Sequence, residues 1–166
     1  MKRINLFKAA SILILSGLLS TSIQAQEVNV GGTVTKPFKI NASSFATMKR
    51  IEVSTGGHDG KTHIYSGVSL YEILTKAEAI PANQLKGKQM AKYVLISAAD
   101  NYQVVLAIPE FDPAFTDQLI ILADQEDGEK LPANLGPFRL VVPKDKKQAR
   151  SVMRVTAIDV LDARKP

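Results

Sequence analysis

Turn dipeptides recur through this chain and divide it into short apolar segments. Asp59-Gly60, Asp100-Asn101 and Asp127-Gly128 each lie between two such segments, and Asp-Gly suits the two-residue turns of β-hairpins. Turn signals at this density indicate many short strands. Strands are predicted over residues 28–35, 51–58, 61–66, 92–98, 102–108, 118–123, 138–142 and 151–161. We therefore expect a mixed, strand-rich α+β fold.

The Asp59-Gly60 turn predicts a hairpin with a defined register. A two-residue turn at this point pairs His58 with Lys61 and Gly56 with His63. Alternation of side chains then separates two faces of the hairpin. The face suited to a core carries Ile51, Val53, Thr55 and Ile64. The opposite, polar face carries Glu52, Ser54, His58, Lys61, His63 and Tyr65.

Both histidines of the chain lie on that predicted polar face, on a cross-strand diagonal. Together with Glu52 or Asp59, they could ligate a metal ion. A solvent-facing hairpin is the competing interpretation, because catalytic zinc normally takes three protein ligands. His58 and His63 are therefore kept as candidate metal ligands.

One helix is predicted over Leu70–Ala79. Ser69 and Glu72 form the S-x-x-E pattern of a capping box, and Pro81 is expected to end the helix. The apolar residues of this segment recur at helical spacing and suit packing against a core. They are Leu70, Ile73, Leu74 and Ala77.

Two other segments have their own signals. A short helix is predicted over residues 42–48, after Asn41. Residues 151–161 carry apolar side chains on both faces, which predicts a strand in the centre of a sheet.

The first 25 residues have the layout of a secretory signal peptide. Three basic residues precede the apolar run Ala9–Leu19, and cleavage is predicted after Ala25. The run is 11 residues long, whereas a membrane-spanning helix needs about 20. Loss of this segment lowers the net charge from +5 to +2, which is not the electrostatic footprint of a nucleic-acid-binding protein. We expect an exported protein, periplasmic or secreted, with one domain over residues 26–166 and no remaining membrane span.

The chain contains no cysteine. This excludes disulfides, zinc–thiolate sites, iron–sulfur clusters and cysteine nucleophiles. The phosphate-binding loop, H-E-x-x-H and G-x-S-x-G patterns are also absent. With 166 residues, 45% of them hydrophobic, the chain is long enough for one domain with a core.

Arg139 lies inside the apolar segment 138–142. A buried guanidinium needs an anionic partner, because an unpaired buried charge is costly. The partner could be a phosphate or carboxylate of a ligand, or one of three protein carboxylates, Asp100, Glu110 and Asp112. A run of basic residues follows, which could rim an anion pocket or form a solvated loop. It contains Lys144, Lys146, Lys147, Arg150 and Arg154.

Several motifs occur in the order typical of one known family. They are GVSLYEIL at 67–74, ADNY at 99–102, IILA at 120–123, DGEKL at 127–131, GPFRLVVP at 136–143 and RSV at 150–152. Over about residues 34–160 the chain resembles the oxidoreductase molybdopterin-binding domain, which has the sulfite oxidase fold. The resemblance implies a cleft for an anionic pyranopterin phosphate, with molybdopterin as a possible cofactor.

Site residues are carried over by position. The resemblance implies that Arg139, Arg150 and Ser151 lie nearest the cofactor, that Asp100 and Tyr102 lie on a neighbouring loop, and that Gly136 shapes the backbone. The family's metal-ligating cysteine belongs near residues 54–57, and a hydroxyl is a poor substitute for it. Lys2-Arg3 stands where export of a folded, cofactor-loaded protein uses two arginines.

Three functions from different classes follow. The first is an exported binding module, without molybdenum redox catalysis, that holds a small anionic ligand or a partner protein. The ligand would be pterin-like or phosphate-like. The second is a molybdopterin-dependent oxidoreductase, or a subunit of one. The third is a metal-binding protein that uses the histidines. The missing cysteine favours the first.

Overall fold

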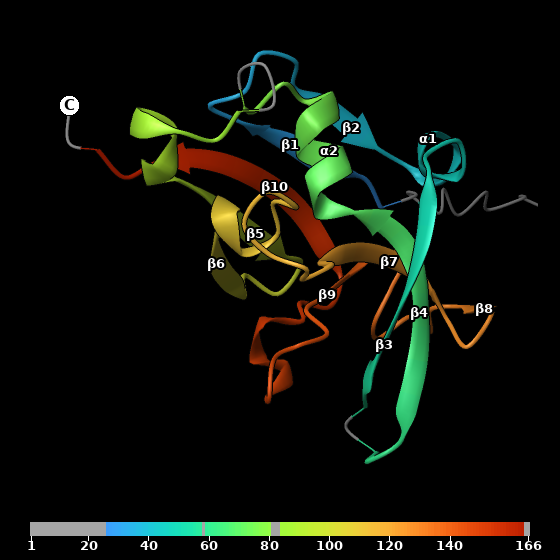
Figure 1. The fold of residues 1–166 in the computed structure, drawn as a ribbon. Coiled ribbons are helices and arrows are strands. Elements are labelled where there is room, and N and C mark those ends of the chain that lie inside the picture. Colours follow the sequence, from blue (N-terminus) through green and yellow to red (C-terminus); the bar gives the residue numbers. More distant parts are fainter. Residues whose placement is uncertain (1–25, 58, 81–83, 165–166) are drawn as a thin grey trace, which may run out of the picture.

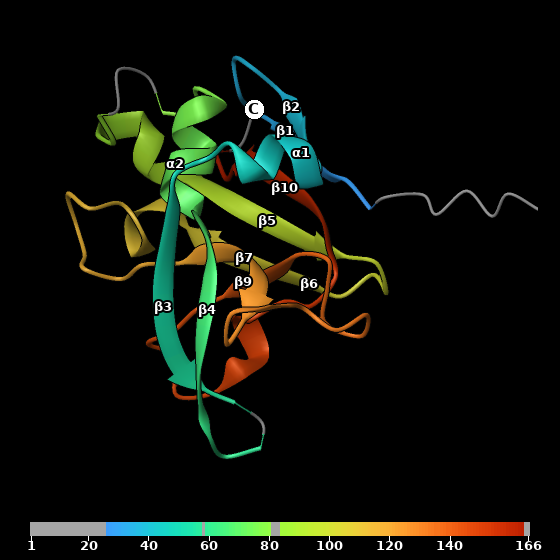
Figure 2. The same cartoon turned by 90° about the vertical axis from the view of Figure 1, so that its right-hand side faces the viewer.

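The computed structural model describes residues 26–57, 59–80 and 84–164, and these form two sheets (Figures 1 and 2). The first sheet has the order β2-β1-β10-β5-β6. Its strands are β1 (Val28–Gly32), β2 (Phe38–Ile40), β5 (Lys92–Ala98), β6 (Gln103–Ala107) and β10 (Val155–Asp162). The second has the order β3-β4-β7-β8, and β9 also pairs with β7. Its strands are β3 (Arg50–Gly56), β4 (Thr62–Ser69), β7 (Ile121–Glu126), β8 (Glu129–Lys130) and β9 (Arg139–Val141).

The prediction of a central last strand is confirmed. β10 runs parallel to β1 on one side and antiparallel to β5 on the other. It begins at Val155, four residues later than expected. The preceding residues include a short 3₁₀ helix, Gln148–Arg150.

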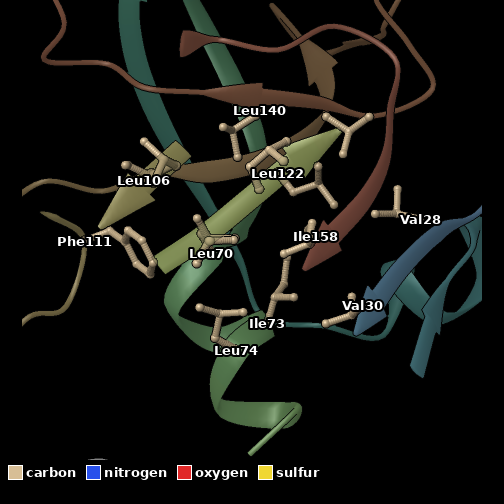
Figure 3. Close-up of a cluster of buried hydrophobic side chains, with 14 of the residues drawn as sticks. Val28, Val30, Leu70, Ile73, Leu74, Leu106, Phe111, Leu122, Leu140 and Ile158 are labelled. Atoms are coloured by element: carbon tan, nitrogen blue, oxygen red, sulfur yellow. The ribbon is translucent and has the colours of Figure 1, made fainter. Parts of the chain in front are cut away.

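Helix α2 (Leu70–Lys76) packs on the first sheet and buries the predicted apolar stripe. Figure 3 shows Leu70, Ile73 and Leu74 directed into the main core, where Ile158 of β10 also lies. The predicted capping box is wrong, because the Ser69 side chain makes no capping hydrogen bond. β4 instead continues directly into the helix, so a tertiary contact replaces the cap: the Leu70 N–H donates to the Ile120 carbonyl.

Helix α1 (Ala42–Ala46) follows Asn41 as predicted. The Asn41 side chain accepts a hydrogen bond from the Ser44 N–H.

Helix α2 is shorter than predicted and is followed by Glu78 in the left-handed region, at φ 51°. Pro81 and the signal segment 1–25 lie outside the described residues. No helix in the described part of the chain is long and apolar enough to cross a membrane.

The β3–β4 hairpin is present, but its predicted register is wrong by one residue. Thr55 pairs with His63, where a two-residue turn would have placed Gly56 opposite His63. The connection is longer than two residues, because the Gly57 N–H donates to the Lys61 carbonyl at 2.6 Å. The hairpin extends well beyond the body of the domain (Figures 1 and 2).

The shift moves side chains between the faces of β4, since successive residues of a strand point to opposite sides. His63 and Tyr65 lie on the same face as the buried Val53, and Tyr65 is itself buried. Ile64, which was expected to face the core, is exposed. The sequence predicts that His63 and Tyr65 face solvent. They instead lie on the side of the hairpin that packs on the apolar cluster of the second sheet, and Tyr65 is a member of that cluster.

Candidate functional site

A hollow of about 540 Å³ lies between the β5–β6 turn and the segment that precedes β10. We call it the first hollow. Its lining residues are Ala98, Asp100, Tyr102, Asn134, Lys147, Gln148, Ala149, Ser151, Val152, Met153 and Arg154. Three of the site residues implied by the resemblance, Asp100, Tyr102 and Ser151, are therefore brought together.

The β5–β6 turn is held in place by its own polar side chains. The Asp100 carboxylate accepts from the Tyr102 N–H at 3.0 Å, and Asn101 takes the left-handed conformation, at φ 67°. The Tyr102 hydroxyl donates across the first hollow to the Ala149 carbonyl at 2.7 Å. This bond ties the turn to the 3₁₀ segment on the opposite wall.

The first hollow carries more positive than negative charge. Lys147 and Arg154 line it, and Asp100 is its one acidic residue. Neither cation forms an ion pair with any residue that the structure describes. Both side chains are therefore available to an anion in the hollow.

Arg139 is 3% exposed and bonds only to neutral groups in the described chain. Its Nη1 donates to the Tyr65 hydroxyl at 2.8 Å and its Nη2 to the Gln148 side-chain oxygen at 2.7 Å. Its Nε has no hydrogen-bond partner among the described residues. The guanidinium also lies 4.9 Å from the centre of the Tyr65 ring, a cation–π contact.

The three protein carboxylates considered for Arg139 bond elsewhere. Asp100 bonds to its own turn, Glu110 to Arg150 and Asp112 to the Ala114 N–H. The expectation that one of these carboxylates pairs with Arg139 is wrong. The reason is that Asp100 lies in the β5–β6 turn and Glu110 and Asp112 lie in the segment after β6, whereas Arg139 bonds to β4 and to the segment before β10.

Arg150 is placed away from the first hollow's lining. It bonds to Asp145 through two nitrogens at 2.8 Å, and to Glu110 through Nη1 at 2.5 Å. These two carboxylates raise the pKa of Arg150 above its ordinary value, and Arg150 lowers the pKa of Asp145. Its charge is compensated within the protein.

Ser151 and Gly136 serve the backbone. Ser151 lines the first hollow, and its hydroxyl accepts from the Val142 N–H at 3.1 Å. Gly136 is buried and precedes the cis peptide to Pro137. A Cβ on Gly136 would lie 2.9 Å from the Leu131 Cβ, so the position has little room for a side chain.

A second hollow, of about 410 Å³, adjoins the first. Asn134 and Met153 line both. The other residues of the second hollow are Gly57, Asp59, His63, Tyr65, Glu126, Leu135 and Arg139. Arg139 thus lines the second hollow and reaches the first through Gln148.

Tyr65 and Glu126 are site residues that the sequence did not reveal. The Tyr65 hydroxyl donates to a Glu126 carboxylate oxygen at 2.5 Å while it accepts from Arg139. Burial and the bond to Glu126 raise the pKa of Tyr65 to about 12, so the phenol keeps its proton. No motif marks these residues, and the predicted register placed Tyr65 on the solvent face.

Both ring nitrogens of His63 contact carboxylates. Its Nδ1 lies 2.6 Å from Asp127 and its Nε2 lies 3.1 Å from Asp59. Among the residues that the structure describes, no group of three or more acidic or histidine side chains is arranged to hold a metal ion. His58 lies outside the described residues, so the proposed His58–His63 pair stays a prediction.

Comparisons with known proteins agree with the strand-rich architecture. A sequence model of the family described as oxidoreductase molybdopterin binding domain matches residues 18–166. The structure is similar to that of the sulfane dehydrogenase SoxCD from Paracoccus pantotrophus, with a TM-score of 0.66 and 18% sequence identity. The likeness covers 82% of this chain and 38% of the SoxCD chain. No curated protein matches the sequence.

These comparisons confirm the predicted sulfite oxidase-like, α+β fold. At 18% identity the structural likeness concerns the fold alone. The residues that line both hollows lie within the range matched by the family model. It begins inside the segment predicted to be a signal peptide, so the domain boundary at residue 26 stays a prediction.

Proposed function

We propose that this chain, which belongs to the oxidoreductase molybdopterin-binding domain family, binds the anionic part of a small, phosphate-bearing ligand where the first and second hollows adjoin. The observation that carries the proposal is the buried charge of Arg139, which bonds only to neutral groups among the described residues. A buried guanidinium without a direct ion pair is costly. Glu126 reaches Arg139 only through the Tyr65 hydroxyl, and a bound anion would offset that cost. Lys147 and Arg154 supply further positive charge in the adjoining first hollow.

The family implies a molybdopterin cofactor, whose two halves make different demands on the site. The phosphate of the pterin needs cations and backbone donors, and the first hollow offers Lys147 and Arg154. These residues fit the phosphate half. The proposal therefore includes a pterin phosphate among the ligands.

The metal half of that cofactor does not fit. The family's thiolate ligand has no counterpart, because the chain has no cysteine. Gly57 lies in the segment where the resemblance places that cysteine. It has little room for a side chain, because a Cβ there would lie 2.6 Å from the His63 Cδ2. We therefore propose binding without thiolate-held molybdenum and derive no redox step.

Export is part of the same proposal. Residues 1–25 carry the signal-peptide pattern, and a protein threaded unfolded through a membrane takes up its ligand afterwards. The ligand would then be one available in a periplasm or outside the cell. A partner protein that covers the two hollows is the alternative occupant.

The test is calorimetric titration of the chain with pyrophosphate at low ionic strength, where screening is weak. The double variant Lys147→Ala/Arg154→Ala is expected to bind at least about 10-fold more weakly, because two charge-assisted hydrogen bonds are lost. Lys146→Ala is the matched control, since Lys146 is exposed on the same segment and does not line the first hollow.

Two results would contradict the proposal. Equal affinity of the double variant and the wild type would place the anion elsewhere. An equal loss in Lys146→Ala would show that binding depends on general charge. Elemental analysis of protein purified from its native source tests the alternative of a molybdopterin-dependent oxidoreductase. One molybdenum atom per chain would overturn the metal-free proposal.

A further inference from the structure

Arg139 decides the direction of the hydrogen bonds around it, because a guanidinium has N–H donors and no acceptor. Its Nη1 donates to the Tyr65 hydroxyl at 2.8 Å and its Nη2 donates to Gln148 Oε1 at 2.7 Å. The Tyr65 hydroxyl in turn donates its own proton to Glu126 at 2.5 Å. On this side the hydrogen bonds therefore end at a carboxylate, and on the other side they reach Gln148.

The same argument fixes the orientation of the Gln148 carboxamide. The atom that meets Arg139 must be the carboxamide oxygen, since the opposite orientation would set two N–H donors against each other. The Nε2 amide forms no hydrogen bond with a described residue, and it is not one of the described buried atoms that lack a partner. Because Gln148 lines the first hollow, Nε2 is the donor that Gln148 offers to a molecule there.

The backbone that carries Gln148 is held by its neighbours. Gln148 begins the 3₁₀ helix between β9 and β10 (orange to red in Figure 1), and its carbonyl accepts from the Ser151 N–H at 2.9 Å. The next carbonyl, that of Ala149, accepts from the Tyr102 hydroxyl at 2.7 Å. Arg150 is held by two carboxylates. The position of the amide donor is therefore set before a ligand arrives, which lowers the entropy cost of binding.

Arg139 itself is poorly placed to touch a ligand in the first hollow. It is 3% exposed and does not line that hollow. Its Nε is buried without a hydrogen-bond partner among the described residues, and its guanidinium lies 4.9 Å from the centre of the Tyr65 ring. Its charge acts on the first hollow by polarising the Gln148 carboxamide, because hydrogen bonds in a chain strengthen one another.

We propose that Gln148 binds the anion at the junction of the two hollows through its Nε2 amide, and that Arg139 is a positioning residue that fixes the direction of this donor. The inference rests on the proposed function and specifies the ligand group as an oxygen that carries no proton. A group with its own N–H or O–H would set a donor against a donor. Lys147 and Arg154 offer donors on the same segment, whereas Asp100 lies in the β5–β6 turn on the other wall.

The first test measures the protein alone, by urea unfolding of the full chain. Gln148→Glu keeps an oxygen for Arg139 and adds a negative charge beside it, so its urea midpoint should equal or exceed that of the wild type. Gln148→Met removes the acceptor, so its midpoint should fall. Gln103→Met is the matched control, because Gln103 is exposed and lines neither hollow. A midpoint lower for Gln148→Glu than for Gln148→Met would show that the oxygen does not face Arg139 and would overturn the inference.

The second test is calorimetric titration of these variants with pyrophosphate at low ionic strength. Gln148→Met should bind about 10-fold more weakly, because a hydrogen bond to a charged group is lost. Gln148→Glu should lose at least as much affinity, since its carboxylate repels the anion, and Gln103→Met should match the wild type. Unchanged affinity of Gln148→Met, together with weaker binding by Lys147→Ala/Arg154→Ala, would refute the role of Gln148 and leave the proposed function standing.

Side-chain NMR separates contact with the ligand from a purely structural role. The Gln148 carboxamide signals, assigned by their loss in Gln148→Met, should shift when pyrophosphate is added. The Arg139 Nε–H signal, assigned by its loss in Arg139→Met, should shift less. A carboxamide that does not respond would make Gln148 a structural partner of Arg139 only, and a response confined to Arg139 would show direct contact with the guanidinium. Either result contradicts the inference.

The protein-only test distinguishes failure of this inference from failure of the proposed function. If the wild type does not bind pyrophosphate, the proposed function fails, and the ligand contact of Gln148 fails with it. The urea midpoints still decide whether Arg139 fixes the direction of the carboxamide, because they are measured without ligand.

Discussion

Replacing Gly67 with alanine is expected to lower the free energy of unfolding by about 3 kcal/mol or more, at the upper end of overpacking effects. Gly67 lies in β4 opposite Ala123 of β7. A Cβ at Gly67 would overlap the Leu122 carbonyl oxygen and lie 2.6 Å from the Ala123 Cα. Both obstacles are backbone atoms of a buried strand, so no rotamer change relieves the overlap, and β4 would have to move away from β7.

Gly56→Ala provides the matched control. Gly56 lies on the hairpin partner β3, and a Cβ there meets no atom within 4 Å. Alanine loses less backbone entropy than glycine on folding, by up to about 1 kcal/mol, so this variant should be neutral or slightly stabilised. Urea unfolding followed by circular dichroism measures both. Equal stability of the Gly67→Ala variant and wild type would mean that β4 and β7 do not approach as described.

The second large effect is expected at Arg139, where Arg139→Met should abolish anion binding without lowering stability. Arg139 is 3% exposed, and its bonds to Tyr65 and Gln148 join it to neutral groups. Methionine fills a similar space without the cost of desolvating a charge. Apolar replacements of buried charged groups are often neutral or stabilising by about 1–4 kcal/mol. We expect the free energy of unfolding to rise by about 1 kcal/mol.

Pyrophosphate titration and urea unfolding of the Arg139→Met variant measure the two parts of this prediction. Arg150→Met is the contrasting variant, because it leaves Asp145 and Glu110 without the cation that they share. That variant should be less stable than the wild type. If Arg139→Met is instead strongly destabilised, Arg139 is a structural element of the second sheet. The anion-binding proposal would then lose its main support.

Local patterns were enough for much of the secondary structure. The Asp127-Gly128 turn has the two positive φ values, 50° and 85°, that suit a tight hairpin. The stripe of α2 is buried as its spacing indicates. Apolar residues on both faces identified β10 as central. In each case the signal depends on residues adjacent in sequence, and the same residues determine the local backbone.

The candidate site needed the tertiary structure. The chain by itself showed that Arg139, inside an apolar strand, must have a partner. It did not show which group that partner is, because several carboxylates far apart in the sequence carry the same charge and are equally suitable. Folding brought Tyr65 and Gln148 to the guanidinium and paired Glu110 with Arg150 instead.

The hairpin register had the same dependence on long-range contacts. A two-residue turn was the local optimum for Asp59-Gly60, yet the loop is longer and His63 pairs with Thr55. That register allows His63 to reach Asp127, which lies 64 residues away in the chain. The sequence alone thus determined most strands, the Asp127-Gly128 turn and the burial of Arg139 within an apolar strand. The tertiary structure decided which charges compensate each other, because that choice depends on distances between segments that no local pattern encodes.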